Sequence, residues 1–214
     1  MTALSPTVFV VDDYAPVRSS ISRLLRAAGF AVAAFASAQE FLAQYDPQVL
    51  GCIVLDLAMP DLNGLELQDM LAKAGTFLPI IFLTGTADIP KSVQAMKRGA
   101  SDFLTKPVND EDLLAAVRVA IEKDRALRHE QAELSEIRAR LATLTPRERE
   151  VLEYVVTGKL NKQIAGDLGT VEQTVKVHRA RVMEKMRVQS VAELVRLTQR
   201  CGIVARQGRF TLRC

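Results

Sequence analysis

Polar side chains that could bind a metal ion or a phosphoryl group directly follow, or end, four short apolar runs of the chain. These residues are Asp12, Asp13, Asp56, Thr84 and Lys106. Three carboxylates brought together repel one another unless a cation joins them, and a hard, oxygen-preferring ion such as Mg²⁺ suits such a set. A lysine ammonium and a threonine hydroxyl beside them could bind a phosphoryl group. Any one of these residues alone would ordinarily be interpreted as a cap or a surface charge.

The run that leads to Asp56 indicates how the chain would position such a residue. Cys52 to Leu55 is apolar without alternation, and turn-forming residues follow Asp56 at once. This pattern is typical of a strand buried on both faces, with the carboxylate at its C-terminal end. Asp56 taken alone could equally cap a turn. Cys52 is expected to pack in the strand as a small apolar residue.

Strand and helix patterns alternate through residues 1–124. The expected strands are Val8–Val11, Ala31–Phe35, Cys52–Asp56, Pro79–Thr84 and Asp102–Thr105. The expected helices cover 16–28, 38–45, 64–73, 88–98 and a segment that begins at Asp110 behind the cap Asn109. This order predicts an α/β fold with a doubly wound, five-stranded parallel sheet. The C-terminal ends of its strands would bring the polar residues to one crevice.

Residues 5–124 resemble the receiver domain of two-component response regulators, which has a flavodoxin-like fold. The resemblance is carried by Val10-Val11-Asp12-Asp13, Leu55-Asp56 through Gly64, Leu83-Thr84-Gly85, and Asp102 through Pro107. It implies that Asp56 accepts a phosphoryl group from the phosphohistidine of a sensor histidine kinase. It also implies that Mg²⁺ is the cofactor. Its ligands would be Asp13, Asp56 and the main-chain carbonyl of Ala58, with Asp12 acting directly or through water.

The same resemblance assigns the parts of a switch. Lys106 would pair with the phosphoryl oxygens and precede a cis peptide, Thr84 would hydrogen-bond the phosphate, and Phe103 would turn inward. Ala58 and Thr86 stand at positions that vary in the family and tune the lifetime of the phosphoryl group. Phosphorylation adds negative charge and acceptor oxygens beside a metal and a lysine. An element with two arrangements of similar energy can transmit that change.

Residues 125–143 are expected to form a helical linker. Leu or Ala recurs every seventh residue from Leu113 to Leu141, and neither Gly nor Pro occurs between Val108 and Thr145. The repeat fits two interpretations. One is a short coiled-coil seam that joins two protomers, and the other is a solvated helix that packs on its own domain.

Residues 144–214 predict a small all-α domain with a basic C-terminal tail over 203–214. Helix starts are indicated by side chains that can cap the first turn. The expected caps are Thr145 with Glu148, Asn161, Thr170 with Gln173, and Ser190 with Glu193. Two helices joined by a short turn inside a basic unit are typical of helix-turn-helix DNA binding.

The third helix of this domain has two different faces when its residues are placed at roughly 100° intervals. Val175, Val182 and Met186 share the face expected to join the core. The opposite face carries Gln173, Lys176, Val177 and Ala180, with Arg179 and Arg181 at its edges. Small or hydrogen-bonding residues flanked by cations suit a helix in the major groove. The alternative is a generic basic surface helix, and His178 is expected to be packed.

Residues 143–200 resemble the LuxR-type helix-turn-helix domain, through Leu144 to Leu152, Asn161 to Ala165 and Thr174 to Arg179. The resemblance implies base-edge contacts for Lys176 and Val177 and phosphate contacts for Lys162 and Thr174. The helix pattern adds Gln173, Arg179 and Arg181 to the expected DNA-binding residues. At position 180 some relatives carry a basic residue that contacts the bases, whereas this chain has Ala180. The final helix is where family members dimerise on DNA, and both domains together resemble the NarL/FixJ family.

Charge is divided unevenly along the chain. Residues 1–124 carry 10 basic and 15 acidic side chains, whereas residues 145–214 carry 14 and 7, so the second part suits nucleic acid. No apolar run is long enough to span a bilayer, and the first residues lack the pattern of a signal peptide. Three cysteines are too few and too scattered for a disulfide framework. A cytoplasmic protein without membrane contact is expected.

These features predict a transcription regulator in which phosphorylation at Asp56 promotes homodimerisation or promoter binding. The protein is expected to catalyse only its own phosphorylation and dephosphorylation, and otherwise not to be an enzyme. Two other classes of protein share part of this pattern. A haloacid-dehalogenase-type phosphatase also uses an aspartyl nucleophile with Mg²⁺, but typically has a second Asp two residues later, where this chain has Ala58. A DNA-binding or docking module with a vestigial receiver would not need the complete set of polar residues.

Overall fold

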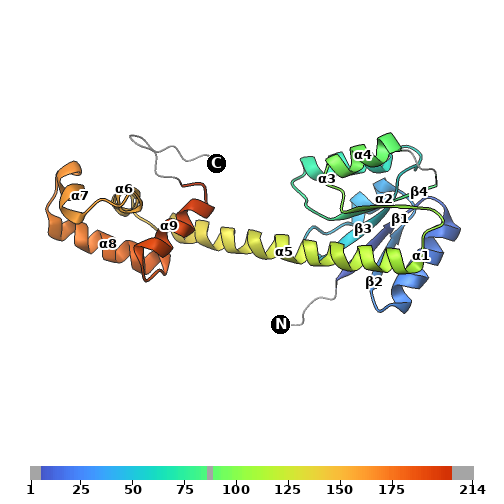
Figure 1. Cartoon of the computed structure of the whole chain (residues 1–214), viewed down its shortest axis with the longest axis horizontal. Helices are drawn as coiled ribbons and strands as arrows, with labels where there is room; N and C mark the ends of the chain where they lie inside the picture. The colour runs from blue at the N-terminus through green and yellow to red at the C-terminus, as the bar shows by residue number, and fades with distance from the viewer. Residues whose placement is uncertain (1–5, 86–88, 204–214) are drawn as a thin grey trace. The chain divides into compact units, whose positions relative to one another are not determined.

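The chain divides into two compact units, an N-terminal unit, Met1–Arg128, and a C-terminal unit, His129–Cys214. The structure is a computed structural model that describes residues 6–85 and 89–203 (Figure 1). Thr86 and the predicted tail beyond Ile203 lie outside the described residues.

The N-terminal unit is built on a five-stranded sheet in which every neighbouring pair is parallel. The strands are β1 Thr7–Val11, β2 Ala31–Phe35, β3 Gly51–Asp56, β4 Ile80–Thr84 and β5 Asp102–Thr105, in the order β2-β1-β3-β4-β5. All six residues of β3 are buried, as expected for a central strand covered on both faces. The predicted doubly wound α/β fold is therefore confirmed.

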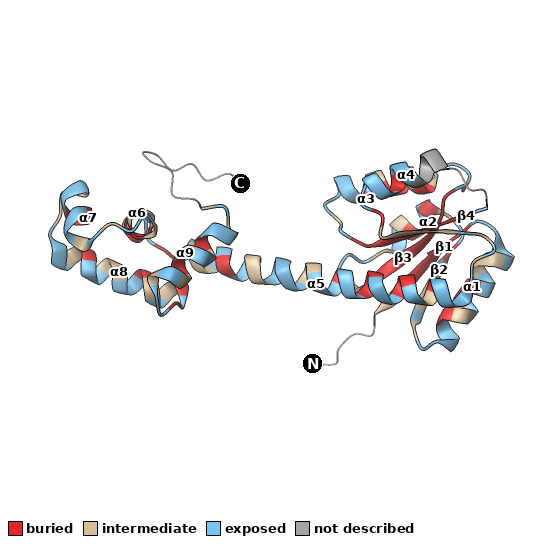
Figure 2. Cartoon of the chain, in the orientation of Figure 1, coloured by how far each residue is buried: buried red, intermediate tan, exposed pale blue. Residues whose placement is uncertain are grey.

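Helices cover both faces of the sheet (Figures 1 and 2). One core lies between the sheet and α1 and α5, and the other lies between the sheet and α2, α3 and α4. The helices are α1 Ala15–Ala27, α2 Ala38–Gln44, α3 Gly64–Lys73, α4 Ile89–Lys97 and α5 Asp110–Ala142. Cys52 is fully buried in the core under α1 and α5, as its pattern predicted.

Over residues 129–203, the part of the C-terminal unit that the structure describes, the secondary structure is all α-helical, as predicted. Besides the last turns of α5 it contains α6 Pro146–Val156, α7 Asn161–Asp167, α8 Glu172–Met186 and α9 Val191–Arg200. Its core gathers apolar residues from all of these helices, including Ile137, Leu152, Ile164, Val175 and Leu194.

The heptad row of α5 is divided between the two cores. Leu113 and Ala120 are buried in the N-terminal unit. Ile137, Leu141 and Leu144, which continue the pattern, pack in the core of the C-terminal unit. Leu127 and Leu134, in the middle of the row, are half-buried and belong to neither core, so the coiled-coil seam between two protomers stays a prediction beside packing on the helix's own domain.

The capping predictions have mixed outcomes. Thr145 and Glu148 form the expected capping box at α6, and the Asn109 side chain accepts N–H groups from the first turn of α5. The box of Thr170 with Gln173 is wrong. The N–H of Thr170 donates to the carbonyl of Ala165 and closes the turn after α7, so the chain enters α8 one residue later.

The N-cap of α8 is Val171, which cannot accept a hydrogen bond from the helix through its side chain. Asn161 is likewise not the cap of α7. The N-cap is Leu160, whose N–H donates to the side chain of Gln163, so the helix begins one residue earlier than predicted. Asn161 is the first helical residue, and its side chain is free to bond elsewhere.

Candidate functional site

Three carboxylates converge at the C-terminal edge of the sheet. Asp12 directly follows β1, Asp13 comes next, and Asp56 ends β3, which pairs with β1. One oxygen of each carboxylate lies within 4.8 Å of the others. Asp12 and Asp56 are only 1% and 6% exposed, whereas Asp13 faces solvent. The sequence prediction that these residues meet in one crevice is confirmed by their geometry.

Lys106, which directly follows β5, joins two of these carboxylates. Its Nζ donates to Asp12 Oδ2 at 2.7 Å and to Asp56 Oδ1 at 2.9 Å. The main-chain N–H of Lys106 donates to the carbonyl of Thr84 at 2.7 Å, and the peptide between Lys106 and Pro107 is cis, as the resemblance implied. Desolvation opposes the charged ammonium, but its hydrogen bonds to Asp12 and Asp56 outweigh that cost and raise the pKa of Lys106.

The two expected switch residues lie on the strands beside this cluster. Thr84 is the last residue of β4 and is 4% exposed; its neighbour Leu83 is paired with Asp56. Phe103 on β5 is half-buried, and its ring centre lies 6.3 Å from that of Phe82. Ala58 is exposed, two residues beyond β3.

The donor set of the crevice fits a hard divalent cation. All three side-chain donors are carboxylates, the ligands that Mg²⁺ prefers, and they converge from separate segments of the chain. Lys106 pairs with two of the three carboxylates, and Arg18 reaches only main-chain carbonyls, so the clustered carboxylates outnumber the cations beside them. An ion such as Mg²⁺ would offset that excess.

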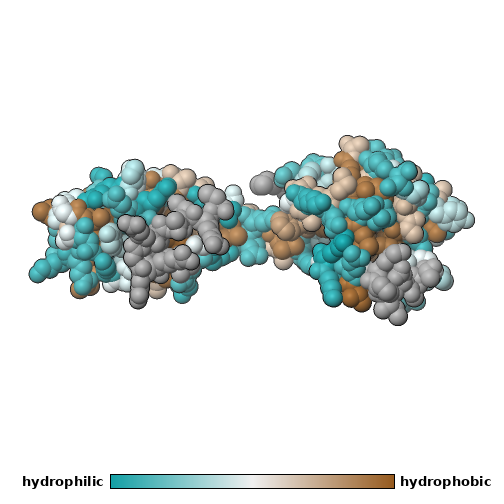
Figure 3. All heavy atoms as spheres, turned by 90° about the horizontal axis from the view of Figure 1, so that it is seen from above, coloured by the Kyte–Doolittle hydropathy of each residue, from teal (hydrophilic) through white to brown (hydrophobic). Residues whose placement is uncertain are grey.

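The predicted DNA-binding residues lie on α7 and α8 of the C-terminal unit. Val175, Val182 and Met186 are buried, so α8 turns the expected face to the core. Thr174 and Arg179 are half-buried, and the remaining predicted contacts are exposed. Those exposed residues are Lys162, Gln173, Lys176, Val177 and Arg181. Figure 3 shows hydrophilic side chains over much of this unit.

Two of these cations already have partners. Lys176 Nζ lies 3.2 Å from the carboxylate of Glu172, one turn earlier on α8. This pair is about half exposed, so little free energy is needed to separate it. Arg179 Nη1 donates to Asn161 Oδ1 at 3.0 Å and so links α8 to α7. His178 is half-buried, in agreement with its predicted packing.

A partly buried ion pair inside the C-terminal unit was missed by sequence reasoning. Lys185 Nζ lies 2.6 Å from Glu148 Oε2 and also donates to the carbonyl of Thr143. The hydrogen bond from Lys185, with that from the N–H of Thr145, lowers the pKa of Glu148 to about 2. The capping box placed Glu148, but nothing in the spacing pointed to Lys185 on α8.

A second missed residue lies beside the acidic crevice. Arg18 on α1 donates from Nη1 to the main-chain carbonyls of Asp12, at 2.6 Å, and Asp13, at 3.2 Å. Its position five residues after Asp13, on the helix that follows β1, is the signal that could have found it.

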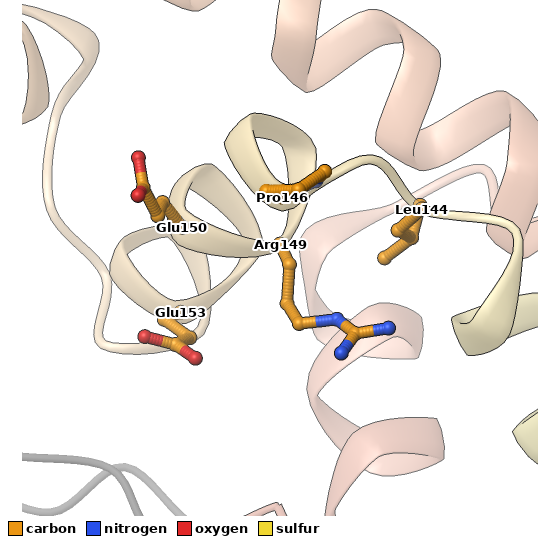
Figure 4. A pocket seen from close by; sticks show the side chains of 5 residues that line it. All are labelled: Leu144, Pro146, Arg149, Glu150 and Glu153. Carbon is orange, nitrogen blue, oxygen red and sulfur yellow. The ribbon is translucent and has the colours of Figure 1, made fainter.

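A shallow hollow on the C-terminal unit contains none of the predicted site residues. It is lined by Leu144, Pro146, Arg149, Glu150 and Glu153 (Figure 4). Burial and the neighbouring carboxylate of Glu150 raise the pKa of Glu153. Arg149 donates to the carbonyl of Leu141 at 3.3 Å. With these contacts, the charged groups that line the hollow are ordinary surface side chains of α6.

The comparisons with known proteins agree with both units. Residues 8–118 match the response regulator receiver domain, and residues 142–198 match the luxR family of bacterial regulatory proteins. Nodulation protein W of Bradyrhizobium diazoefficiens is 47% identical over 92% of this chain and 87% of its own length. The transcriptional regulatory protein FixJ of Rhizobium meliloti is 46% identical over 89% and 94%.

Solved structures show the same likeness. The response regulator StyR superimposes with a TM-score of 0.83 at 44% identity, over 91% of this chain and 98% of that one. The N-terminal part of FixJ gives a TM-score of 0.52 at 43% identity, over 57% of this chain and 96% of that one. Within the part of the chain that the structure describes, no helix is long and apolar enough to cross a membrane.

A parallel sheet with an acidic crevice, joined in one chain to a helix-turn-helix unit, defines a receiver domain with a DNA-binding output. The chain belongs to the NarL/FixJ family of response regulators. It is therefore a DNA-binding transcriptional regulator controlled by phosphorylation, and the family is not one of classical enzymes.

Proposed function

We propose that Asp56 is the phosphoryl acceptor, and that Mg²⁺, Lys106 and Thr84 support the transfer. The observation that carries the proposal is the bridge of Lys106 between Asp12 and Asp56, beside the exposed Asp13. In the transfer, an oxygen of Asp56 forms a bond to phosphorus. The N–P bond of the sensor kinase phosphohistidine breaks, and its electron pair returns to the imidazole nitrogen.

Each neighbouring residue has a distinct part in this proposal. Asp12, Asp13, Asp56 and the carbonyl of Ala58 would hold Mg²⁺, Asp12 directly or through water. Bound there, the ion supplies positive charge to the phosphoryl oxygens. Lys106 turns its ammonium from the carboxylates to the new phosphoryl group, and the Thr84 hydroxyl donates to it. Phe103 moves inward and alters the surface of the N-terminal unit. The chain would catalyse only its own phosphorylation and dephosphorylation.

The output in this proposal is promoter binding by α8. Lys176 and Val177 would contact base edges, as would Gln173, while Lys162, Thr174, Arg179 and Arg181 would contact phosphates. Phosphorylation would promote a homodimer, and a dimer would bind two half-sites more tightly than a monomer binds one. The proposed domains are 1–124, 125–143 and 144–214.

The phosphorylation step is tested with acetyl phosphate and Mg²⁺ on the full chain, with Asp56→Ala as the matched variant. The native protein should gain one phosphoryl group by mass spectrometry, and its dimerisation and DNA affinity should rise. Asp56→Ala should show none of these changes. Unmodified native protein, or equal behaviour of the two proteins, would contradict the proposal.

The DNA step is tested with fragments selected from genomic DNA by the phosphorylated protein. Lys176→Ala should weaken binding by about 5- to 100-fold, the loss expected for one base contact, while phosphorylation stays intact. Glu150→Gln on α6, outside the proposed interface, is the control and should bind normally. Unchanged affinity of Lys176→Ala would contradict the assignment of α8 to the groove.

A further inference from the structure

The loop between β1 and α1 carries two of the three carboxylates, and a guanidinium donates to its main-chain carbonyls. Tyr14 is the N-cap residue of α1, and among the described residues its side chain makes no capping hydrogen bond. Arg18, in the first turns of the same helix, supplies a different anchor. Its Nη1 donates to the carbonyl of Asp12 at 2.6 Å and to that of Asp13 at 3.2 Å.

Asp12 and Asp56 have several other anchors. Asp12 is buried, its carboxylate accepts hydrogen bonds from Lys106 and from the N–H of Tyr14, and its own N–H pairs with β2. Asp56 lies in a central strand and also accepts from Lys106. Neither residue depends on Arg18 alone for its place.

Asp13 differs from both. Its side chain is exposed, and among the described residues its carboxylate has no hydrogen bond or ion pair. The bond from Arg18 to the main-chain carbonyl of Asp13 is therefore the one hydrogen bond from a side chain to this residue within the described part of the chain. A residue held only through its main chain becomes mobile when that contact is lost.

We propose that Arg18 is a positioning residue for the metal site, holding the β1–α1 loop so that the Asp13 carboxylate stays beside Asp12 and Asp56. The inference rests on the proposed function, because it takes Asp13 as a Mg²⁺ ligand. Arg18 acts through the main chain and does not touch the metal. The planar guanidinium suits this task, since one donor group can reach two neighbouring carbonyls.

The direction in which Mg²⁺ affinity changes separates a positioning role of Arg18 from an effect of its charge alone. The positive charge of Arg18 opposes a cation in the crevice, so its removal alone would strengthen Mg²⁺ binding. Loss of the anchor would weaken it. A net weakening in Arg18→Ala can therefore come only from the loss of the anchor.

Mg²⁺ affinity is measured by calorimetric titration of the full chain with the metal alone. Arg18→Ala should weaken binding by about 3- to 10-fold, the equivalent of one net hydrogen bond. Arg18→Lys keeps the charge, but its side chain is one bond shorter than the path to Nη1, so it should reach the two carbonyls poorly and weaken Mg²⁺ binding too. It also carries the test if the alanine variant does not fold. Arg23→Ala on the same helix removes an exposed arginine, and its affinity should stay within about twofold, because an exposed charge of this kind is screened.

A double-mutant cycle with Asp13→Asn completes the test. If Arg18 acts through Asp13, Arg18→Ala should add no further loss to Asp13→Asn. Two results would overturn the inference while the proposed function stands. One is that the losses of Mg²⁺ affinity in the two single variants add fully in the double variant. The other is that Arg18→Ala binds Mg²⁺ as well as Arg23→Ala does. Native protein that takes up no Mg²⁺ would overturn both.

Discussion

Gly51 and Asp124 are joined across 73 residues of chain, because the N–H of Gly51 donates to Asp124 Oδ2 at 2.8 Å. The same oxygen accepts from Arg128 Nε at 2.9 Å, and the guanidinium of Arg128 also donates to the carbonyls of Gln48 and Val49. Asp124 is 2% exposed. This carboxylate therefore holds α5 against the start of β3, at the N-terminal ends of the strands, opposite the acidic crevice.

Asp124→Ala is expected to lower the free energy of unfolding of the N-terminal unit by about 2–4 kcal/mol, because it leaves the Gly51 N–H unpaired in the core and Arg128 without its counter-charge. Urea unfolding followed by circular dichroism measures the loss. Glu122→Gln, which changes an exposed carboxylate on the same helix, should stay within about 0.5 kcal/mol of the native protein. Equal stability of the two variants would refute the role of Asp124.

Gly64→Ala is expected to strain the loop after Asp56. A Cβ at Gly64 would lie 2.7 Å from the main-chain oxygen of Asp56 and 2.9 Å from the ring of Phe82. The main chain has little room to move there, since the N–H of Gly64 also donates to the carbonyl of Leu57. The unfolding free energy should fall by about 1–3 kcal/mol, the usual cost of overpacking. Modification of Asp56 by acetyl phosphate should also become slower.

The comparison for Gly64 is Gly85→Ala, where an added Cβ meets no atom within 4 Å. Its stability should differ from the native value by no more than about 0.5 kcal/mol. Thermal unfolding of both variants, followed side by side, decides the matter. If Gly64→Ala proved as stable as Gly85→Ala, the loop would be able to move enough to accommodate the added methyl group, and the predicted strain would be refuted.

The parallel sheet was predictable because its information is local. Each strand of the N-terminal unit is a short apolar run, and β2 and β5 begin and end at the residues that the pattern predicted, Ala31–Phe35 and Asp102–Thr105. Parallel strands with helical crossovers then bring their C-terminal ends together. The meeting of Asp12, Asp56 and Lys106 follows from that topology without further information.

The sequence did not reveal the contacts of side chains with main-chain groups, whether near in the chain, as for Arg18, or far, as for Asp124. Arg18 donates to carbonyls, and Asp124 accepts from the Gly51 N–H, and the residue type that carries the main-chain group announces neither contact. The start of α8 failed for a related reason. In the predicted box the Gln173 side chain would accept the N–H of Thr170, but the carbonyl of Ala165 in the preceding turn accepts that N–H instead, a competition that propensity alone does not describe.

Glu148 is expected to make the stability of the C-terminal unit fall in acid. Its pKa in the folded chain is about 2, against an ordinary value of 4.5, chiefly because Lys185 donates to it. A lowered pKa stabilises the fold above the ordinary value, and that stabilisation is lost as the pH falls from about 4.5 towards 2. Glu148→Gln has no carboxylate charge to lose. The difference between its unfolding midpoint and that of the native protein should therefore shrink as the pH falls through this range.

Glu150→Gln serves as the comparison for Glu148, since this neighbour on α6 is about half exposed. It should keep the acid sensitivity of the native protein. The midpoints are measured by thermal unfolding at several pH values between about 2 and 7, the window set by the pKa shift of Glu148. A constant difference between native protein and Glu148→Gln across the window would rule out the ion pair as its source.

Asn161 and Arg179 allow the position of a DNA-binding cation to be separated from its charge. Arg179→Ala removes a proposed phosphate contact, so DNA affinity should fall, and the slope of log affinity against log salt should decrease by about 1. Asn161→Ala removes no charge but releases the Arg179 side chain, which is held at 3.0 Å. It should lower affinity by about 2- to 10-fold, the value of one hydrogen bond, and leave the salt slope unchanged. Fluorescence anisotropy with one promoter fragment at several salt concentrations gives both quantities. If Asn161→Ala altered the slope as much as Arg179→Ala does, Asn161 would act on the phosphate contacts themselves and not through the placement of Arg179.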